Sequence, residues 1–539
     1  MVRPLLLVFA ACTGDPSGDD DGVDNGSTDA DGGTGDTDVP AEVIRDPRFD
    51  GVALILDLEV DDQVFASGVS IAVREQGQIT WAEGFGSADP DESVAVTPAT
   101  RFQIGSTTKQ MTAALVLRQV EAGTFALEDH VSTALPDVSL DGDPTWADDA
   151  SLEILLSHQG GIVDYIDWVG SSDDDQLAAW HEGFFKNTLW ANNPPGAFWN
   201  YSNPNFTVSG LAAEAHDPLG RYYPDMMVED LFLPLGMEAT VARKDEVEEP
   251  YATSTGLDAL SGEFGTIAMD DQFDSASVRP AGLVWSTPTD MTSWGSFLLH
   301  GDPNVLSDAL RAEIQTPRVS TLYLDDHVQY GLGLFVYDLF PLSDGSYVPL
   351  TLWEHAGNTL SMTSAFLVLP EQDVVVSILS NGYADSFPQT IEALLHVVVE
   401  PFPEPSDYVP TVDPEVTALH VGSYDDPHNV GPIEITPGAD GGLEIAMPLL
   451  DDLGYDIEPE LIAITSDFFY IQINGLGFAD LAFVRDPAGG PSLWARSRTF
   501  VGERVPPDLP ARPLPPADRA PPVLDFGPLP TSLLRPPVR

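Results

Sequence analysis

The chain has 539 residues, 43% of them hydrophobic and 9% aromatic, so it can bury a substantial core and wholesale disorder is excluded. A single cysteine rules out a disulfide scaffold and any cysteine-ligated zinc or iron–sulfur site. Because there are 86 acidic side chains and only 22 lysines and arginines, the formal charge is −64, which repels phosphate backbones and argues against nucleic acid as a partner.

Residues 1–12 predict an export signal. Arg3 supplies a positive start, residues 5–9 are apolar, and two alanines precede Cys12, the single cysteine. This arrangement resembles a bacterial lipoprotein signal, in which the cysteine becomes the lipidated first residue after cleavage. We therefore expect an exported protein of the cell envelope, anchored in the membrane through a lipid on Cys12. The alternative interpretation is an incidental or buried cysteine.

Residues 13–42 predict a disordered acidic linker. They are almost wholly Gly, Asp, Ser and Thr, with nine aspartates, so they have little apolar surface to bury and they repel one another. About 30 residues of flexible chain span roughly 30 Å, a length that suits a tether. The spacing from Ser27 to Asp38 loosely resembles a calcium-binding loop, but the twelfth residue is Asp rather than Glu, so a plain linker is favoured.

Residues 43–400 predict one α+β body. A helix, a β-hairpin and a long helix come first, further helices occupy the middle, and strands return before a last helix, which is typical of an antiparallel sheet flanked by helices. The expected helices are 49–62, 107–122, 151–157, 206–216, 224–232 and 388–399, and the expected strands are 67–74, a partner strand ending at 85, 330–337, 351–354, 364–369 and 374–379.

Two further segments follow a proline-rich break at 401–405. Residues 413–503 contain short alternating strands with Gly and Asp turns and no long helix, so they predict a small all-β domain that folds on its own. Residues 504–539 hold twelve prolines between positions 506 and 537, which predicts an extended tail of the polyproline II type.

Residues 105–109, with the sequence Gly-Ser-Thr-Thr-Lys, are the most informative stretch. An apolar-periodic helix follows them, so Ser106 lies at a helix N-terminus and Lys109 lies one turn further on the same face. A serine hydroxyl is a poor nucleophile until a base takes its proton, and a neutral, desolvated lysine amine is such a base. The alternative is a helix-capping serine with a surface lysine, but the chain holds only three lysines.

Two later triplets could complete such a site. Tyr201 precedes Ser202 and Asn203, and a tyrosine near a lysine can serve first as base and then as acid. His355 is followed by an alanine and Gly357 after a strand, and a residue without a Cβ lets a substrate lie alongside that strand. The backbone N–H of Asn358 could then pair with that of Ser106 as an oxyanion hole. Each triplet alone is commonplace.

Together, in this order, the three motifs resemble the β-lactamase-related serine hydrolases, the penicillin-recognising enzymes. The resemblance extends from Ser67 to about Asp385, and the segment after Asp413 is similar to the lipocalin-like domains that follow some members. Further matching stretches are residues 102–106 (Phe-Gln-Ile-Gly-Ser), 155–158 (Leu-Leu-Ser-His), 195–196 (Pro-Gly), 234–237 (Pro-Leu-Gly-Met), 281–283 (Ala-Gly-Leu), 330–333 (Tyr-Gly-Leu-Gly) and 379–381 (Leu-Ser-Asn).

The resemblance implies a β-lactamase/transpeptidase-like fold and an acyl-enzyme mechanism without cofactor or metal. By position, Ser106 is the acylated nucleophile, and Lys109 and Tyr201 are its base system. The residues that the resemblance places against the substrate are Asn203, His355, Gly357 and Asn358.

Two departures from the family pattern bear on the substrate. His355 stands where β-lactamases typically have a lysine, so a permanent cation for a substrate carboxylate is missing; residues 158–161 read His-Gln-Gly-Gly where relatives usually have His-Thr-Ser-Gly. We therefore expect a D,D-carboxypeptidase, D-aminopeptidase or esterase, acting on a small peptide or ester. The alternatives are a β-lactamase proper and a catalytically silent penicillin-binding-type envelope protein.

Other hydrolase classes lack their motifs in this sequence. There is no Gly-x-Ser-x-Gly elbow of an α/β-hydrolase and no His-Glu-x-x-His of a zinc peptidase. The ten histidines are scattered, and we assign His158, His216 and His396 to helix packing or to the surface.

Overall fold

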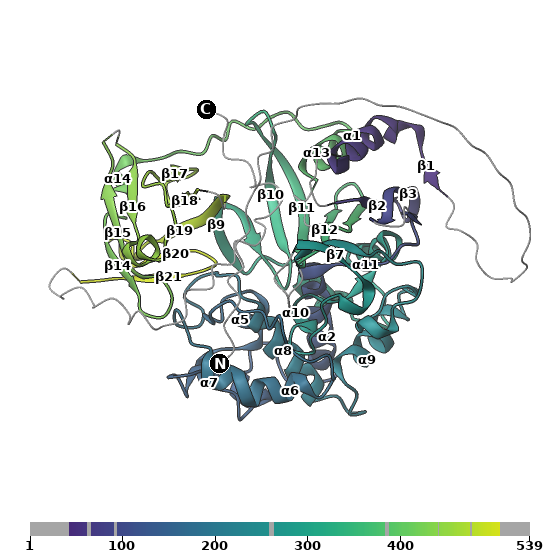
Figure 1. Ribbon diagram of the computed structural model, residues 1–539, viewed down its shortest axis with the longest axis horizontal. Coiled ribbons are helices and arrows are strands. Elements are labelled where there is room, and N and C mark those ends of the chain that lie inside the picture. Colours follow the sequence, from purple (N-terminus) through teal and green to yellow (C-terminus); the bar gives the residue numbers. More distant parts are fainter. Residues whose placement is uncertain are drawn as a thin grey trace, which may run out of the picture.

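The structure is a computed structural model that describes residues 43–61, 66–90, 94–257, 264–382, 387–439, 441–474 and 477–506. The predicted signal with Cys12, the predicted linker 13–42 and nearly all of the predicted tail lie outside the described residues. Figure 1 shows a body of sheet and helices beside a second, smaller sheet.

The body is built on an antiparallel sheet whose strand order is β1-β3-β2-β13-β12-β11-β10-β9, with β4 paired to β3. The hairpin of β2 and β3 comes from the start of the body and pairs through β2 with β13 from its end. The strands are β1 (Ile44–Arg45), β2 (Gly68–Glu75), β3 (Gln78–Asp89), β4 (Val94–Ala95), β9 (Val319–Tyr330), β10 (Phe335–Pro341), β11 (Tyr347–Asn358), β12 (Thr363–Leu369) and β13 (Val374–Ser380).

Helices cover both faces of this sheet, and its central strands are therefore apolar on both sides. Leu367 of β12 belongs to one core cluster, which includes residues of α1 (Asp50–Asp61) and α13 (Pro388–Val398). The neighbouring Phe366 belongs to a second cluster, shared with α2 (Lys109–Glu121) and α11 (Pro288–His300). Because successive strand residues face opposite sides, this burial explains the unbroken apolar run of β12.

The second core cluster continues into a group of helices below the sheet in Figure 1. Its helices are α3 (Val131–Ala134), α4 (Trp146–Asp149), α5 (Leu152–Leu156), α6 (Gln176–Trp180), η3 (His181–Phe185), α7 (Lys186–Thr188), α8 (Asn203–Ala215), α9 (Tyr223–Met227), η4 (Val228–Phe232), α10 (Arg279–Gly282) and α12 (Asp308–Ile314). Two short hairpins accompany them: β5 (Phe102–Gln103) with β8 (Trp285–Ser286), and β6 (Ser254–Leu257) with β7 (Phe264–Ile267).

The strand predicted over 330–337 is wrong in position. β9 ends at Tyr330 and β10 starts at Phe335, and the residues between them form a turn in which Gly333 has φ +84°. A Cβ on Gly333 would lie 2.8 Å from the backbone oxygen of Lys109, so this turn packs directly on the start of α2. The strand predicted at 351–354 is longer, since β11 runs from Tyr347 to Asn358.

The predicted fold class is confirmed at the C-terminal end as well, where eight strands form a curled sheet. Its strand order is β16-β15-β14-β21-β20-β19-β18-β17, and the backbone N–H of Ile445 in β16 bonds the carbonyl of Pro459 at 2.7 Å, which brings the two ends of the sheet together. The elements are α14 (Pro414–Thr417), β14 (Gly422–Asp426), β15 (Gly431–Pro437), β16 (Leu443–Ala446), α15 (Pro448–Asp452), β17 (Ile462–Ala463), β18 (Phe468–Ile473), β19 (Gly477–Val484), β20 (Trp494–Arg496) and β21 (Val501–Arg504).

This C-terminal sheet packs against the body. Phe468 and Tyr470 of β18 belong to the same core cluster as the outer strands of the main sheet, and the ring of Phe468 lies 5.0 Å from that of Tyr323 in β9. The domain boundaries at residues 400 and 413 and the independent folding of 413–503 stay predictions.

None of the helices in the described ranges combines the length and hydropathy that a membrane span requires. The negative charge lies mainly beyond residue 42, where 76 acidic and 21 basic side chains leave a net charge of −55. Several arginines hold more than one carboxylate, as Arg221 does with Asp217, Glu229 and Asp230, each at 2.8 Å. With 76 acidic and 21 basic side chains in this part of the sequence, the negative charges still outnumber the positive ones more than threefold.

We expect the melting temperature to rise as sodium chloride increases from roughly 0.05 to 1 M, because the Debye length falls from about 14 to about 3 Å and repulsion between exposed carboxylates weakens. Differential scanning fluorimetry over this range tests the expectation, with potassium glutamate as a matched salt. A flat or falling melting temperature would mean that the charges are compensated, for example by bound divalent cations, and a chelator would then lower stability at low salt.

Candidate active site

The turn that carries Ser106 is held against β11 by buried hydrogen bonds. Residues Gly105–Thr108 form the short 3-10 helix η2, which runs directly into α2. The Thr107 hydroxyl donates to the carbonyl of His355 at 3.1 Å and pairs with the Ser364 hydroxyl at 2.8 Å. Ser106 is thereby placed beside the C-terminal end of β11, as the motif order predicts.

Glycines allow this close approach. Gly105 has φ +53°, and a Cβ on it would lie 2.5 Å from the backbone nitrogen of Asn358. A Cβ on Gly357 would lie only 2.0 Å from the carbonyl oxygen of Ile104. The reason for Gly357 therefore differs from the sequence-based argument: the turn before Ser106, rather than a substrate, requires the missing side chain. Its predicted place beside a substrate stays a prediction.

Changing Gly357 to alanine is expected to destabilise the protein by about 1–3 kcal/mol, because the nearest obstructing atom is the backbone oxygen of Ile104, which cannot turn aside. The melting temperature and the labelling of Ser106 by a fluorophosphonate should both fall. Gly51→Ala is the control, since no atom lies within 4 Å of a Cβ at this exposed position of α1. Wild-type melting and labelling in Gly357→Ala would contradict the packing argument.

Lys109 is fully buried and its amine contacts three oxygens. Nζ lies 2.9 Å from Ser106 Oγ, 2.7 Å from Asn203 Oδ1 and 2.7 Å from the carbonyl of Ala281. Burial lowers the pKa of Lys109 well below its usual value, and Arg498 lowers it further, while Asp164 opposes both effects. Burial therefore favours a neutral amine.

A neutral lysine amine has two N–H donors and one lone pair. When the amine is neutral, the Asn203 and Ala281 oxygens, which only accept, can take its two N–H groups, and its lone pair is then available to the Ser106 hydroxyl. The serine hydroxyl can then donate its proton to Nζ. This arrangement is the one that a lysine base for serine activation needs.

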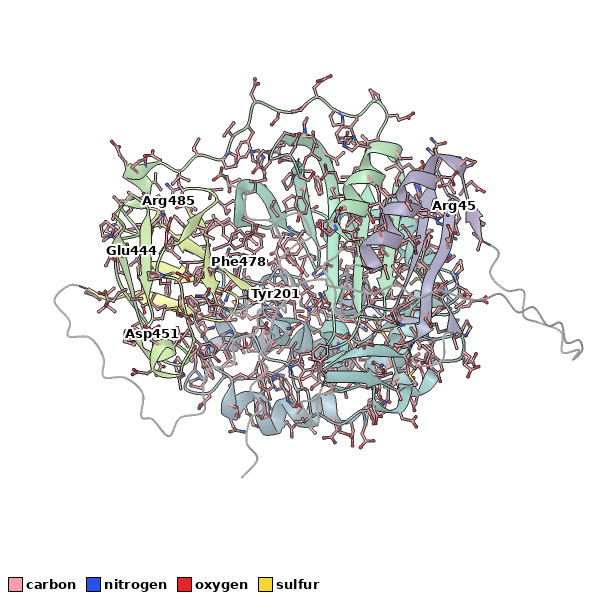
Figure 2. The ribbon with its side chains drawn as sticks, turned by 45° about the horizontal axis from the view of Figure 1, so that its top comes forward. Arg45, Tyr201, Glu444, Asp451, Phe478 and Arg485 are labelled. Carbon is pink, nitrogen blue, oxygen red and sulfur yellow. The ribbon has the colours of Figure 1, made fainter. Side chains whose placement is uncertain are left out.

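Tyr201 lies in the segment before α8 and reaches the same serine. Its hydroxyl donates to Ser106 Oγ at 2.7 Å. The ring packs between His158, with ring centroids 4.2 Å apart, and the guanidinium of Arg498, 4.6 Å from the ring centroid. Figure 2 shows Tyr201 near the middle of the molecule, where the body meets the C-terminal sheet.

His158 has a more specific place than the helix packing or surface that we assigned to it. The residue adopts φ +58°, and its Nδ1 accepts a hydrogen bond of 3.1 Å from the backbone N–H of Ser202. Burial lowers the pKa of His158 well below its usual value, with Lys109 adding to the effect. The neutral ring thus supports one face of Tyr201 and holds the backbone of the Tyr201–Asn203 motif.

His355 is also neutral. Its side chain is buried, Nδ1 lies 2.6 Å from the carbonyl of Ala356, and Nε2 lies 3.1 Å from the Tyr330 hydroxyl. Burial, with Lys109 as the second cause, lowers the pKa of His355 to about 3. The position that would carry a cation in a β-lactamase is therefore uncharged.

A cleft of about 260 Å³, including solvent at its mouth, lies beside Ser106. Asn203 and Asn358 border it, so two predicted substrate contacts do line the space next to the nucleophile. The remaining wall is mainly apolar and is formed by Ile166, Trp168, Phe273, Val278, Ala281, Gly282, Leu283 and Thr359. The predicted oxyanion hole at the backbone N–H groups of Ser106 and Asn358 stays a prediction.

Two charged residues of this site were missed by the sequence analysis. Asp164 Oδ1 accepts from the backbone N–H of Asn203 at 2.7 Å and from its side-chain amide at 3.0 Å. Asp164 Oδ2 accepts from Arg498 Nε at 2.8 Å. These contacts orient the amide of Asn203 so that its oxygen faces Lys109. Within the described ranges, no group of three or more His, Cys, Asp or Glu side chains is arranged to hold a metal ion.

Comparison with known proteins places most of the body in one family. The family model described as Beta-lactamase matches residues 56–398. Penicillin-binding protein 4 of Amycolatopsis lactamdurans is 27% identical over 299 residues, covering 54% of this chain and 74% of that protein. The protein PbpX of Bacillus subtilis is 27% identical over 270 residues, which span 50% of this chain and 62% of PbpX.

Solved structures share the fold at low identity. SurE superposes with a TM-score of 0.62 and 23% identity, covering 85% of this chain and 99% of SurE, so the likeness extends beyond the body. A D-stereospecific amidohydrolase from a Streptomyces species (TM-score 0.51, 24% identity) covers 64% of this chain and 97% of its own. A class C β-lactamase (TM-score 0.51, 18% identity) covers 65% and 94%, respectively.

Proposed function

Because the chain belongs to the Beta-lactamase family, whose members are generally serine hydrolases, we propose that it hydrolyses amide or ester bonds through an acyl-enzyme on Ser106. The observation that carries this proposal is the contact of Ser106 Oγ with both Lys109 Nζ, at 2.9 Å, and the Tyr201 hydroxyl, at 2.7 Å. A nucleophile within hydrogen-bond reach of a desolvated base is what acyl transfer requires.

In the proposed reaction, the Ser106 proton passes to Lys109 as Oγ attacks the substrate carbonyl. Charge develops on the carbonyl oxygen, which the backbone N–H groups of Ser106 and Asn358 would receive. Tyr201 gives a proton to the leaving amine or alcohol, and the proton that Lys109 took from Ser106 then returns to the Tyr201 oxygen. Asn203 holds the amine of Lys109 and lines the cleft, where it can also contact the substrate. The same groups activate water for deacylation.

For the substrate, we propose small amides and esters whose acyl part carries an apolar residue of D configuration. The apolar cleft wall beside Ser106 fits an apolar side chain. Two solved structures with TM-scores of 0.51 and 0.53 to this chain are a D-stereospecific amidohydrolase and a D-amino acid amidase, which supports the choice of configuration. A β-lactamase proper is the second candidate. The neutral His355 makes it less favoured, because the carboxylate of a β-lactam would lack the expected cation.

Four substrates distinguish these activities: D-phenylalanine amide, L-phenylalanine amide, a short-chain 4-nitrophenyl ester and nitrocefin. We expect turnover of the ester and of the D-amide, little turnover of the L-amide and slow turnover of nitrocefin. Faster turnover of nitrocefin than of the amides would favour the β-lactamase. No turnover and no covalent labelling would indicate the catalytically silent envelope protein.

We further propose that the protein is exported and anchored at the cell envelope through a lipid on Cys12. The sequence of residues 1–12 supports the proposal. Cell fractionation of the wild type and of Cys12→Ser tests it: the wild type should sediment with membranes and the variant should not.

A further inference from the structure

The C-terminal sheet reaches the proposed active site through a single hairpin. Arg498 lies at the tip between β20 and β21, where Ser497 N donates to the Phe500 carbonyl at 2.8 Å. Asp480 of β19 fixes this tip, since its Oδ1 accepts from Arg498 N and from the Ser497 hydroxyl, each at 3.1 Å. The side chain of Arg498 is 15% exposed, so it projects from an ordered base into a largely buried place.

From there a chain of contacts leads to the nucleophile. Arg498 Nε bonds Asp164 at 2.8 Å, and Asp164 bonds the backbone and side-chain N–H groups of Asn203. Asn203 Oδ1 bonds Lys109 Nζ, which bonds Ser106 Oγ. The Arg498 guanidinium also lies over the Tyr201 ring, 4.6 Å from its centroid, within the distance at which a cation is attracted to a ring face. Arg498 thus contacts Tyr201 directly and is linked to Lys109 through Asp164 and Asn203.

The charges of Arg498 and Asp164 have opposite effects on the pKa of Lys109. Arg498 lowers the pKa of Lys109 and Asp164 raises it, so together they leave the effect of burial dominant. The other titratable side chains around Lys109 are Tyr201, His158 and His355, and the two histidines are neutral. At neutral pH, the net charge around Lys109 therefore depends on Arg498 and Asp164.

We propose that Arg498 and Asp164 form a pair of opposite charges that positions Ser106 and Lys109. The C-terminal sheet then contributes directly to the active site. The proposal rests on the proposed acyl-enzyme function. The family model matches residues 56–398, and Arg498 lies outside this range. The proposal therefore gives a hairpin outside the matched region a role in catalysis by the matched region.

Opposite shifts in the pH profile test this role. With the full-length chain and 4-nitrophenyl acetate, the acidic limb of kcat/KM should move to higher pH by roughly one unit in Arg498→Gln and to lower pH in Asp164→Asn. The double variant should return to within a few tenths of a unit of the wild type. Arg498→Lys, which keeps the charge, should keep the wild-type profile. The change should appear in kcat rather than in KM for this uncharged ester.

Arg485→Gln is the matched control. Arg485 belongs to the same C-terminal region and pairs with Asp467 at 3.0 Å, but it is exposed, and Figure 2 shows it near the upper edge of that sheet, away from Tyr201. Arg485→Gln should leave the pH profile of kcat/KM and the rate of ester hydrolysis unchanged.

Three results would overturn the proposal. The first is a uniform loss at all pH values in both single variants, as unfolding or simple loosening would give. The second is an unmoved profile. The third is a loss confined to KM for substrates with a free carboxylate, which would make Arg498 a substrate contact. A wild type without turnover or fluorophosphonate labelling would instead contradict the proposed function itself.

Discussion

Replacing Ser106 by alanine is expected to abolish measurable hydrolysis of esters and amides, a loss of at least about 10³-fold in kcat. Alanine removes the atom on which Lys109 and Tyr201 converge and leaves the turn intact, because η2 is held by backbone contacts and by Thr107. Steady-state kinetics with 4-nitrophenyl acetate and D-phenylalanine amide measure the effect. Circular dichroism and melting temperature should stay those of the wild type.

Ser172→Ala serves as the control for Ser106→Ala, since Ser172 is exposed and its backbone carbonyl, which accepts from Arg279, is kept by alanine. It should retain full activity. Turnover within tenfold of the wild type in Ser106→Ala would mean that another group attacks the substrate, and the mechanism would be wrong.

Replacing Lys109 by methionine is expected to lower the rate of acylation by about 10³-fold or more, because the base is lost while the length of the side chain is kept. Two buried oxygens, Asn203 Oδ1 and the Ala281 carbonyl, also lose their donor, so the melting temperature should fall. Stopped-flow labelling with a fluorophosphonate separates acylation from later steps. Lys186→Met, at a position outside the site, is the matched control.

The pH dependence of the wild type follows from the same amine. Burial lowers the pKa of Lys109, so the neutral base persists well below pH 10 and activity is lost only as the pH falls through the lowered value. Protonation gives an ammonium with three donors and no lone pair, which cannot take the Ser106 proton. A rate that rises as the pH falls would contradict a neutral lysine base.

The sequence predicted the nucleophile motif because its members are local. Ser106 and Lys109 lie one helical turn apart, and that spacing alone brings the two side chains together. The helices and the inner strands of the body were also predictable, because the periodicity of apolar residues reports the buried faces directly. The later motifs were brought in by family resemblance, and the structure places Tyr201 and Asn203 against Ser106 and Lys109.

Residues joined only by the tertiary fold were not predictable. Asp164 lies 39 positions from Asn203 and 334 positions from Arg498 in the sequence, although it bonds both. No local sequence pattern distinguishes Asp164 or Arg498 from the other acidic and basic side chains. The contact of His158 with Tyr201 was not predicted for the same reason, since it depends on how two loops pack. The strand at 330–337 was misplaced because alternating apolar residues continue through a turn whose conformation is set by packing on α2.

Mass spectrometry of the trapped intermediate tests the central claim most directly. The full-length protein is acid-quenched during turnover of a slowly hydrolysed ester or β-lactam, digested and sequenced by tandem fragmentation. We predict one acyl group per chain, attached to the Ser106 side chain and missing in Ser106→Ala. Turnover with no adduct on Ser106, or with an adduct on another residue, would contradict an acyl-enzyme at this serine.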